Sequence, residues 1–220
     1  MRRMKKPTLA PQQARSREST RKLLKAAAEV LGQHGVDGAT IPRIAKHAGL
    51  TPGAVYRRFA DKDALLETMV IGIVERQDER LRETITPEIA RQIPLPVLVE
   101  QLIDGMLISY RANANLLRAI RQFVHGRESS AFMAKACKLE MRSFSYLIEL
   151  VLEHRKSIKH PDPRMAIAFA VMTLSSTLIE LILMDRDMKH WQALLPKEHQ
   201  PLKRELKRMM LSYLGVESKA

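Results

Sequence analysis

The chain has 220 residues, of which 45% are hydrophobic and 28% charged, and its formal net charge is +13. This apolar content is enough for one large core or two modest ones, which excludes a wholly disordered chain. The single cysteine, Cys137, excludes an intramolecular disulfide and fits a reducing cytoplasm. The basic start "MRRMKK" is not followed by the apolar run of a signal peptide, so we expect a cytoplasmic protein.

Positive charge is concentrated at the N-terminal end. Residues 1–62 contain 14 Lys and Arg against four acidic residues, a net charge of +10, whereas the other 158 residues carry only +3. This distribution is typical of a phosphate-binding module joined to a nearly neutral body. A solvated basic face would give the same count, so charge alone leaves both interpretations open.

The first predicted elements are an arm and a helix. Residues 1–16 combine basic residues with Pro, Gln and Ala and show no apolar periodicity, which predicts a flexible basic arm. Residues 17–34 are predicted to be helical, with Gly35 as the end, because apolar side chains recur there at helical spacing. These apolar positions are Leu23, Leu24, Ala27, Val30 and Leu31.

Two short helices are predicted next. Thr40 is a suitable N-cap for the first of them, which ends at Gly49. Thr51 is the expected cap of the second, which has Pro52 at its first position and ends near residue 59. A glycine-containing turn therefore joins two helices of only a few residues each.

The second of these short helices divides into two faces. Val55 and Phe59 are one turn apart and are expected to pack inward. The other side chains are expected to lie largely outside: Gly53, Ala54, Tyr56, Arg57 and Arg58. Small and basic residues on the outer face of the second helix are what a helix-turn-helix needs in order to enter the major groove of DNA.

The rest of the chain is predicted to be helical. Asp61 is expected to cap a fourth helix, which charged residues extend to residue 84 as a connector. Prolines at positions 87, 94 and 96 mark a boundary between modules. Beyond it, no segment shows strand alternation, so the expected fold class is all-α. The predicted helices span 96–112, 114–125, 129–156, 163–187 and 201–214.

Residues Thr40 to Leu66 carry a specific pattern, T-x-x-x-I-A-x-x-A-G-L-T-x-G-A-V-Y-x-x-F-x-x-K-x-x-L-L. It resembles the N-terminal signature of the TetR family of bacterial transcriptional regulators, and the resemblance covers about residues 17–70. It implies a homodimer that binds a pseudo-palindromic DNA operator and usually represses transcription until a small effector binds. It also implies three parts: a three-helix DNA-binding domain (17–62), a connecting helix (63–84) and a C-terminal helical ligand-binding and dimerisation domain (85–220).

The resemblance assigns roles to individual residues. Positions that match phosphate contacts are Thr40, Thr51, Tyr56 and Lys62. Positions that match contacts to bases or their flanking backbone are Pro52, Gly53, Ala54 and Arg57. Pro42 lies where some members have a polar base-reading residue, so we expect sparse direct readout. Recognition of the operator is then expected to depend more on DNA shape and on Arg43, Arg57 and Arg58.

Two C-terminal segments have apolar faces. One face of the last helix carries Leu202, Leu206, Met209, Met210 and Tyr213. This stripe fits a dimer interface, as the resemblance implies, or an intramolecular core. Residues 166–184 are long enough to span a bilayer. They contain Glu180 and a cluster of Ser and Thr, so we expect a buried or dimer-forming helix and no membrane partner.

The predicted ligand site lies in the central helices. Arg118 and Gln122 share a face that fits either a polar corner of this site or a solvated surface. Glu180 is expected to face solvent, to pair across a dimer or to point into a pocket. Methionines fit an adaptable apolar cavity or an ordinary core. The candidates are Met106, Tyr110, Arg118, Gln122, Met141, Thr177 and Glu180, for an apolar or amphipathic effector.

Other functions have less support in the sequence. It contains no nucleophile elbow, P-loop, dinucleotide-binding glycine pattern or His-Glu zinc motif, and its histidines lack helical metal spacing. We therefore expect no enzyme activity, metal or cofactor. A non-specific or architectural DNA-binding protein is the competing function, since the N-terminal charge would suffice for it. The effector, the operator, the regulated genes and the choice between repression and activation stay open, as does the role of the arm.

Overall fold

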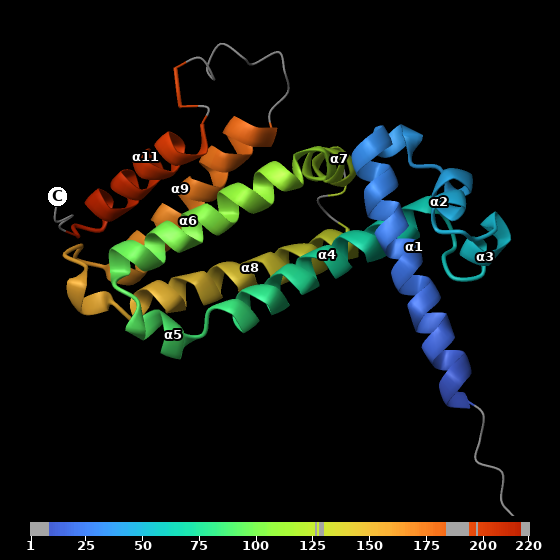
Figure 1. The fold of residues 1–220 in the computed structure, drawn as a ribbon, viewed down its shortest axis with the longest axis horizontal. Helices are drawn as coiled ribbons and strands as arrows, with labels where there is room; N and C mark the ends of the chain where they lie inside the picture. The colour runs from blue at the N-terminus through green and yellow to red at the C-terminus, as the bar shows by residue number, and fades with distance from the viewer. Residues whose placement is uncertain (1–8, 126, 128–129, 184–193, 197, 217–220) are drawn as a thin grey trace, which may run out of the picture.

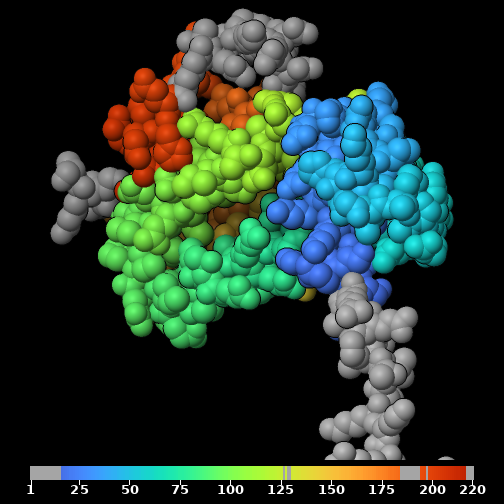
Figure 2. Space-filling model, turned by 45° about the vertical axis from the view of Figure 1, so that its right-hand side comes forward, coloured from blue at the N-terminus to red at the C-terminus, as the bar shows by residue number. Residues whose placement is uncertain are grey.

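The computed structural model describes residues 9–125, 127, 130–183, 194–196 and 198–216. Over these residues the chain is all-α, with no strand, as the sequence predicts. Figure 1 shows an N-terminal lobe, formed by α1 to α3 and the start of α4, at one end of a longer helical body. We call it the DNA-binding lobe because it contains the helices for which the sequence predicts DNA contacts. The space-filling view shows the same lobe beside the body formed by the later helices (Figure 2).

Helix α1 spans Leu9–Gly38, with non-helical geometry at Gly35 (φ 67°, ψ −175°). Its start lies eight residues before the predicted one, so residues 9–16 are helical where the sequence suggests a flexible arm, whose residues 1–8 lie outside the described part. The physical reason is that an existing helix is easily extended. Once the later turns of α1 are packed, adding Ala, Gln and Arg residues at its N-terminal end costs little free energy, even though these residues form no apolar stripe.

Helices α2 (Ile41–His47) and α3 (Pro52–Tyr56) form the predicted pair of short helices. The hydroxyl of Thr40 accepts a hydrogen bond from the amide of Arg43, and that of Thr51 from the amide of Ala54. Gly49, with φ 68°, supplies the left-handed residue that the turn between them requires. Both predicted caps are confirmed, although α3 ends three residues earlier than expected.

Helix α4 (Lys62–Thr84) begins at the predicted cap, where Asp61 accepts a hydrogen bond from the amide of Ala64 at 2.8 Å. It leaves the DNA-binding lobe and runs alongside α8 through the body (Figure 1). The proline-rich stretch that follows was predicted only as a boundary, but it contains a short helix, α5 (Pro87–Gln92). Thr86 caps α5, and Pro87 starts it because its fixed φ suits a first helical position.

The C-terminal helices match the predicted ones with shifted ends. Helix α8 stops at residue 152 rather than 156, and a 3₁₀ turn follows it. Helix α9 continues as a π-helical turn, and the rest of the predicted 163–187 helix lies outside the described residues. The elements are α6 (Leu95–Ala112), α7 (Ala114–Val124), α8 (Ala131–Leu152), η1 (Arg155–Ser157), α9 (Pro163–Leu178), the π turn η2 (Ile179–Leu183) and α11 (His199–Tyr213).

Two large buried clusters hold these helices together. The first joins α1, α2 and α4 to α7 and the start of α8, and includes Leu31, Ile44, Leu66, Phe123 and Phe132. The second joins α6, α8, α9 and α11, and includes Ile103, Val151, Ile167, Leu174 and Leu206. The predicted DNA-binding domain ends at residue 62, but the first cluster also contains residues of α4, α7 and α8. The core of the DNA-binding lobe therefore extends beyond the predicted domain.

One helical stretch in the described part of the chain, Pro163–Leu183, is long and apolar enough to cross a bilayer by length and composition alone. Core helices of folded proteins pass the same test. Here Ile167, Ala170 and Leu174 are buried in the second cluster, against residues of α6 and α11. This stretch therefore packs as part of the helical body, in agreement with the prediction of a buried helix.

Candidate nucleic-acid interface and cavity

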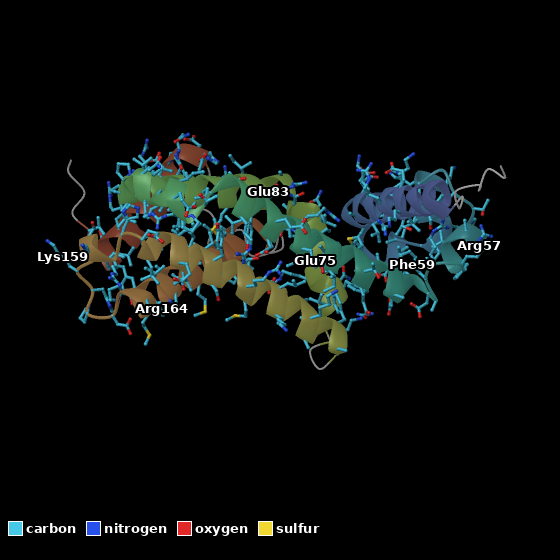
Figure 3. All side chains as sticks on the ribbon, turned by 90° about the horizontal axis from the view of Figure 1, so that it is seen from below. Arg57, Phe59, Glu75, Glu83, Lys159 and Arg164 are labelled. Carbon is cyan, nitrogen blue, oxygen red and sulfur yellow. The ribbon has the colours of Figure 1, made fainter. Side chains whose placement is uncertain are left out.

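The outer surface of α3 lies at the tip of the DNA-binding lobe. Pro52, Gly53 and Arg57 are exposed, and Tyr56 is 57% exposed. In Figure 3, Arg57 points outward at one end of the molecule while Lys159 lies at the opposite end. The structure therefore presents a small-residue surface flanked by a tyrosine and an arginine, as a recognition helix requires.

Two residues predicted to lie on this outer face lie elsewhere. Ala54 is only 8% exposed, because the short α3 turns this position toward the core beside Val55, so the prediction that it lies outside is wrong. Arg58 is half-buried. It donates hydrogen bonds to the carbonyl of Ala54 at 2.6 Å and to the hydroxyl of Ser19 on α1 at 3.4 Å. Its guanidinium thereby ties α3 to α1.

The remaining candidate DNA contacts surround the two helix starts. Thr40 and Thr51 are exposed, and each hydroxyl keeps its hydrogen free to donate while its oxygen caps a helix. Arg43 donates to the carbonyl of Gly38 at 2.7 Å, and Lys62 donates to the carbonyl of Val36 at 3.1 Å. Both cations therefore hold the last residues of α1, beyond its kink at Gly35, and their contact with phosphates stays a prediction.

One polar contact in this lobe was not predicted. His47 on α2 lies 2.8 Å from the carboxylate of Glu29 on α1. They are 18 positions apart in the sequence with no periodic signal, so only the fold brings this pair together. The contact fixes the end of α2 against α1, and thereby the position from which the recognition helix α3 starts.

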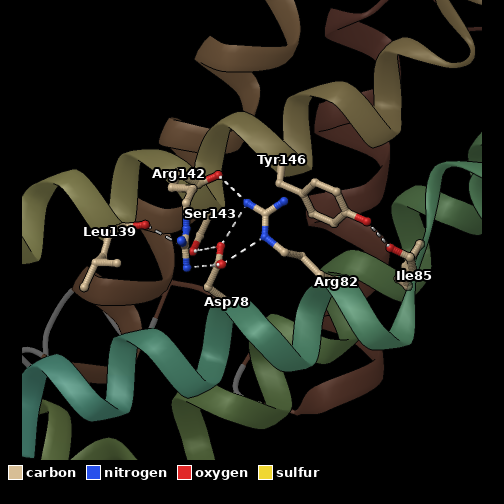
Figure 4. A network of polar contacts seen from close by, with 7 residues as sticks. All are labelled: Asp78, Arg82, Ile85, Leu139, Arg142, Ser143 and Tyr146. Carbon is tan, nitrogen blue, oxygen red and sulfur yellow. Dashed lines mark hydrogen bonds and ion pairs between the residues drawn. The ribbon is translucent and has the colours of Figure 1, made fainter.

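A polar group joins the connecting helix α4 to α8 (Figure 4). We call it the α4–α8 clasp: Asp78, Arg82, Arg142, Ser143 and Tyr146. The side chain of Asp78 is 1% exposed and accepts hydrogen bonds from Arg82 at 2.9 Å and from the hydroxyl of Ser143 at 2.9 Å. A nitrogen of Arg142 lies 2.6 Å from the same carboxylate. The hydrogen bond from Arg82, assisted by Ser143 and both positive charges, lowers the pKa of Asp78.

The aromatic ring of Tyr146 completes the clasp. The guanidinium of Arg82 stacks over this ring at 4.2 Å from its centroid, and the tyrosine hydroxyl donates to the carbonyl of Ile85 at 2.8 Å. Asp78 and Arg82 are four residues apart, a spacing that in sequence indicates only a surface ion pair. The burial of Asp78 against α8 could not be predicted from that spacing.

A cavity of about 400 Å³ lies between α6, α7, the π turn and α11. Its described lining residues are Arg111, Ala114, Arg118, Leu181, Ile182, Leu195, Pro196 and Leu202. Of the seven predicted ligand residues, only Arg118 is among them. The size falls in the range of small-molecule sites, which are mostly apolar with a few placed polar groups.

The other six predicted ligand residues lie outside this lining. Met106 packs partly buried against the second cluster, Tyr110 lies 3.2 Å from the hydroxyl of Ser175, and Thr177 donates to the carbonyl of Thr173. The three that are exposed are Gln122, Met141 and Glu180. Met141 is 63% exposed, so the predicted methionine-lined cavity is not the cavity found. Leu195 and Pro196 gave no helical signal that could have pointed to it.

The apolar stripe predicted on the last helix is mostly intramolecular. Leu202, Leu206 and Met210 are buried in the second cluster, whereas Met209 and Tyr213 are each 40% exposed. The dimer interpretation was therefore wrong for the three buried residues. They pack inward because burial in the cluster removes their apolar surface from water, and Lys203 and Lys207 on the same helix add ion pairs to Glu100 on α6.

A different apolar face is exposed, which we call the α9 stripe: Met165, Phe169, Met172 and Tyr213. The first three lie at successive helical turns of α9 and are 63%, 51% and 61% exposed. The ring of Tyr213 on α11 lies 5.6 Å from that of Phe169, so the patch continues across both helices. Contiguous exposed apolar surface of this kind is typical of a protein interface.

A second cavity, of about 450 Å³, separates α1 from the corner between α6 and α7. Its lining includes Lys25, Glu29 and Asn113, and it shares Arg111 and Ala114 with the first cavity. The α6–α7 corner is therefore a common wall of both cavities. Among the described residues, no group of three or more His, Cys, Asp or Glu is placed to hold a metal ion.

Comparison with known proteins agrees with this geometry. Residues 23–69 match the model of the family described as bacterial regulatory proteins, tetR family. The chain is 30% identical over 73 residues to the HTH-type transcriptional regulator UidR of Escherichia coli K12, which is 33% of this chain and 37% of UidR. It thus aligns with little more than a third of the length of that curated relative.

Two solved structures share the fold along most of the chain. One is described as a TetR-family transcriptional regulator from Mesorhizobium loti, with a TM-score of 0.68 and 19% identity over 91% of this chain and 95% of that one. The other is FadR from Bacillus subtilis in complex with stearoyl-CoA, with a TM-score of 0.61 and 18% identity over 90% of this chain and 98% of that one. Residues 23–69 are therefore similar to the tetR family model, and the fold along most of the chain is similar to that of the two solved regulators.

Proposed function

We propose that the protein is a transcriptional regulator, a repressor that binds a pseudo-palindromic DNA operator as a homodimer and is released by a small effector. The observation that carries this proposal is the exposed face of α3, in a lobe whose sequence matches the family model. It offers the small Gly53 for close approach to base edges, with Tyr56 and Arg57 beside it. Fold and homologues are those of regulators, which are not enzymes.

The predicted DNA contacts divide into two groups under this proposal. Those that are exposed and ready to bind are Thr40, Thr51, Pro52, Gly53, Tyr56 and Arg57. Arg43, Arg58 and Lys62 each donate to a backbone carbonyl and keep further N–H donors for a phosphate or a base, while Ala54 contributes its backbone alone. Direct readout then rests mainly on Arg57, and DNA shape carries the remainder.

Two further features support a regulated dimer. The α9 stripe offers an apolar face for a second copy of the chain, and the first cavity offers room for an effector. One structural neighbour, FadR of Bacillus subtilis, was solved with stearoyl-CoA. The setting we propose is the bacterial cytoplasm, where operator DNA is found.

The experiment that tests this function is selection of bound fragments from the source genome with purified protein, at two salt concentrations. A single enriched palindrome that survives the higher salt is the expected result, because specific sites bind about 10³–10⁷ times tighter than random DNA. Broad enrichment that disappears at the higher salt would support the competing function, a non-specific DNA-binding protein held by phosphate contacts.

A further inference from the structure

Arg118 brings a positive charge to a cavity that is otherwise largely apolar. Besides the two arginines, the described lining consists of Ala, Leu, Ile and Pro side chains. Arg111 has an interaction of its own, and Arg118 makes three hydrogen bonds, all of them to neutral oxygens. Neither Asp nor Glu occurs among the described lining residues.

The hydrogen bonds of Arg118 hold its guanidinium without neutralising it. Nε donates to the carbonyl of Leu183 at 3.1 Å, and Nη2 donates to the carbonyl of Ile182 at 2.7 Å. Nη1 donates to the side-chain oxygen of Asn115 at 2.8 Å. These three acceptors are neutral oxygens. A guanidinium carries five N–H donors, so donors remain for a further acceptor.

A charge beside apolar surface is costly unless it is paired, and an arginine prefers a carboxylate or phosphate because the planar groups bond side by side. An anion with an apolar body would match both features of the cavity, the charge of Arg118 and the apolar side chains around it. Its charged end would meet Arg118, and its body would cover Leu181, Ile182 and Leu202.

We propose that the effector is an amphipathic anion whose acidic head group is bound by Arg118, with its apolar body in the cavity formed by α6, α7, the π turn and α11. This inference rests on the proposed function, since it gives the chemical class of the effector that the function requires. A cationic amphiphile, by contrast, would meet the guanidinium and no carboxylate among the described lining residues.

The position of Arg118 also explains how such an anion would act on DNA binding. Arg118 joins α7 to the π turn. Two residues earlier on α7, Leu116 packs against Gly32 of α1, and a Cβ added at Gly32 would lie 3.4 Å from Leu116. An anion that draws Arg118 away from the carbonyls of Ile182 and Leu183 would move α7. Because α7 and α1 are in close contact, α1 and the DNA-binding lobe would move with it.

The test compares three probes of equal chain length by isothermal titration calorimetry, below their micelle concentrations: decanoate, decyltrimethylammonium and decanol. We expect decanoate to bind at least about tenfold more tightly than the other two, as a charge-assisted hydrogen bond implies. Arg118→Gln should remove that preference, and Arg118→Lys should keep part of it. The matched control is Arg121→Gln, an exposed arginine on the same helix that does not line the cavity.

Arg118→Gln also removes structural hydrogen bonds, so a second variant is needed. Ala114→Phe changes no charge and places a large side chain from the cavity wall into the cavity. It should abolish decanoate binding. The thermal unfolding transition should be retained, which would show that the variant is folded. Equal or tighter binding of the cation, decanoate binding unchanged in Arg118→Gln, or no binding of decanoate at all would overturn the proposal.

Operator binding separates this proposal from the function on which it rests. The anisotropy of a labelled fragment recovered from the genomic selection is measured with and without decanoate. Specific binding that decanoate weakens supports both proposals. Specific binding with no preference for the anion overturns only the effector class, and failure to bind any fragment specifically overturns the proposed function itself.

Discussion

Substitution of Gly53 is expected to change stability and DNA binding in opposite directions. A Cβ built at Gly53 meets nothing within 4 Å, and its φ is not in the left-handed region, so the free protein tolerates a side chain there. Gly53→Ala should raise the free energy of unfolding by up to about 1 kcal/mol, because alanine has the better helix propensity. It should nevertheless weaken operator binding, because a methyl group would stand between α3 and the base edges.

Urea unfolding and fluorescence anisotropy would measure the two effects of Gly53→Ala. Gly49→Ala is the matched control, since Gly49 has equally open surroundings but a φ of 68°. That substitution should destabilise the protein by about 1–2 kcal/mol through backbone strain. Unchanged operator affinity in Gly53→Ala would contradict the placement of this residue against DNA.

The residue scale also shows what the sequence could predict. The caps Thr40, Thr51 and Asp61 follow from local chemistry, and all three are confirmed. The inward turn of Arg58 depends on Ser19 of α1, 39 positions earlier in the chain, and the burial of Ala54 depends on how the short α3 is oriented on the core. Small side chains are compatible with either face of a short helix, so spacing alone could not place Ala54.

At the scale of elements, the α4–α8 clasp is expected to contribute stability that depends on pH. The pKa of Asp78 is lowered in the folded state, chiefly by the hydrogen bond from Arg82. A carboxyl group with a lowered pKa stabilises the fold fully above its unfolded pKa of about 4, and this contribution is lost as the pH falls further. Asp78→Asn should therefore reduce the loss of stability below about pH 4.

The same variant tests the clasp at neutral pH. We expect Asp78→Asn to lower the free energy of unfolding by about 1–3 kcal/mol, because Arg82 and Arg142 lose the charged acceptor that they share, a carboxylate that is buried. Urea unfolding at pH 7, and at a pH roughly one unit or more below the unfolded pKa of about 4, gives both numbers. The neighbouring exposed Glu79→Gln should change stability by less than about 0.5 kcal/mol. An equal effect of both substitutions would mean that the clasp has no special role.

Element boundaries were predicted well only where a cap or a glycine marks them. The start of α4 at Lys62 has such a marker, whereas the start of α1 at Leu9 has none and was missed by eight residues. The short α5 was hidden among prolines that equally favour a turn. The cavity is lined by α6, α7, the π turn, α11 and the stretch before α11, so no single segment carries its pattern.

At the scale of the whole molecule, the α9 stripe predicts the oligomeric state. Phe169→Glu places a charge in the middle of this apolar face and should convert a dimer into a monomer, because an unpaired carboxylate is costly to bury. Analytical ultracentrifugation measures the change. Ile108→Glu, at a 55% exposed position on α6, is the control and should remain dimeric. A dimer that persists in Phe169→Glu would place the interface elsewhere.

The N-terminal charge gives a second prediction at this scale. Deletion of residues 2–14 removes Arg2, Arg3, Lys5 and Lys6, together with the first turns of α1. If this segment binds DNA, the slope of log affinity against log salt should become shallower by about 0.9 for each phosphate that the shortened chain no longer neutralises. Anisotropy titrations at several salt concentrations measure that slope. An unchanged slope would show that the segment does not touch the DNA backbone.

The α9 stripe has a consequence for gene dosage. If two chains must associate through Met165, Phe169 and Met172 before both half-sites of an operator are filled, the active species forms by mass action. When few chains are present, most of them are monomers, and operator occupancy would rise with the square of the number of chains in the cell. Doubling expression would then give about fourfold occupancy. Operator occupancy would therefore depend steeply on the number of protein copies in the cell. This steep dependence would result from the three apolar side chains of α9, without any change in the affinity of α3 for its bases.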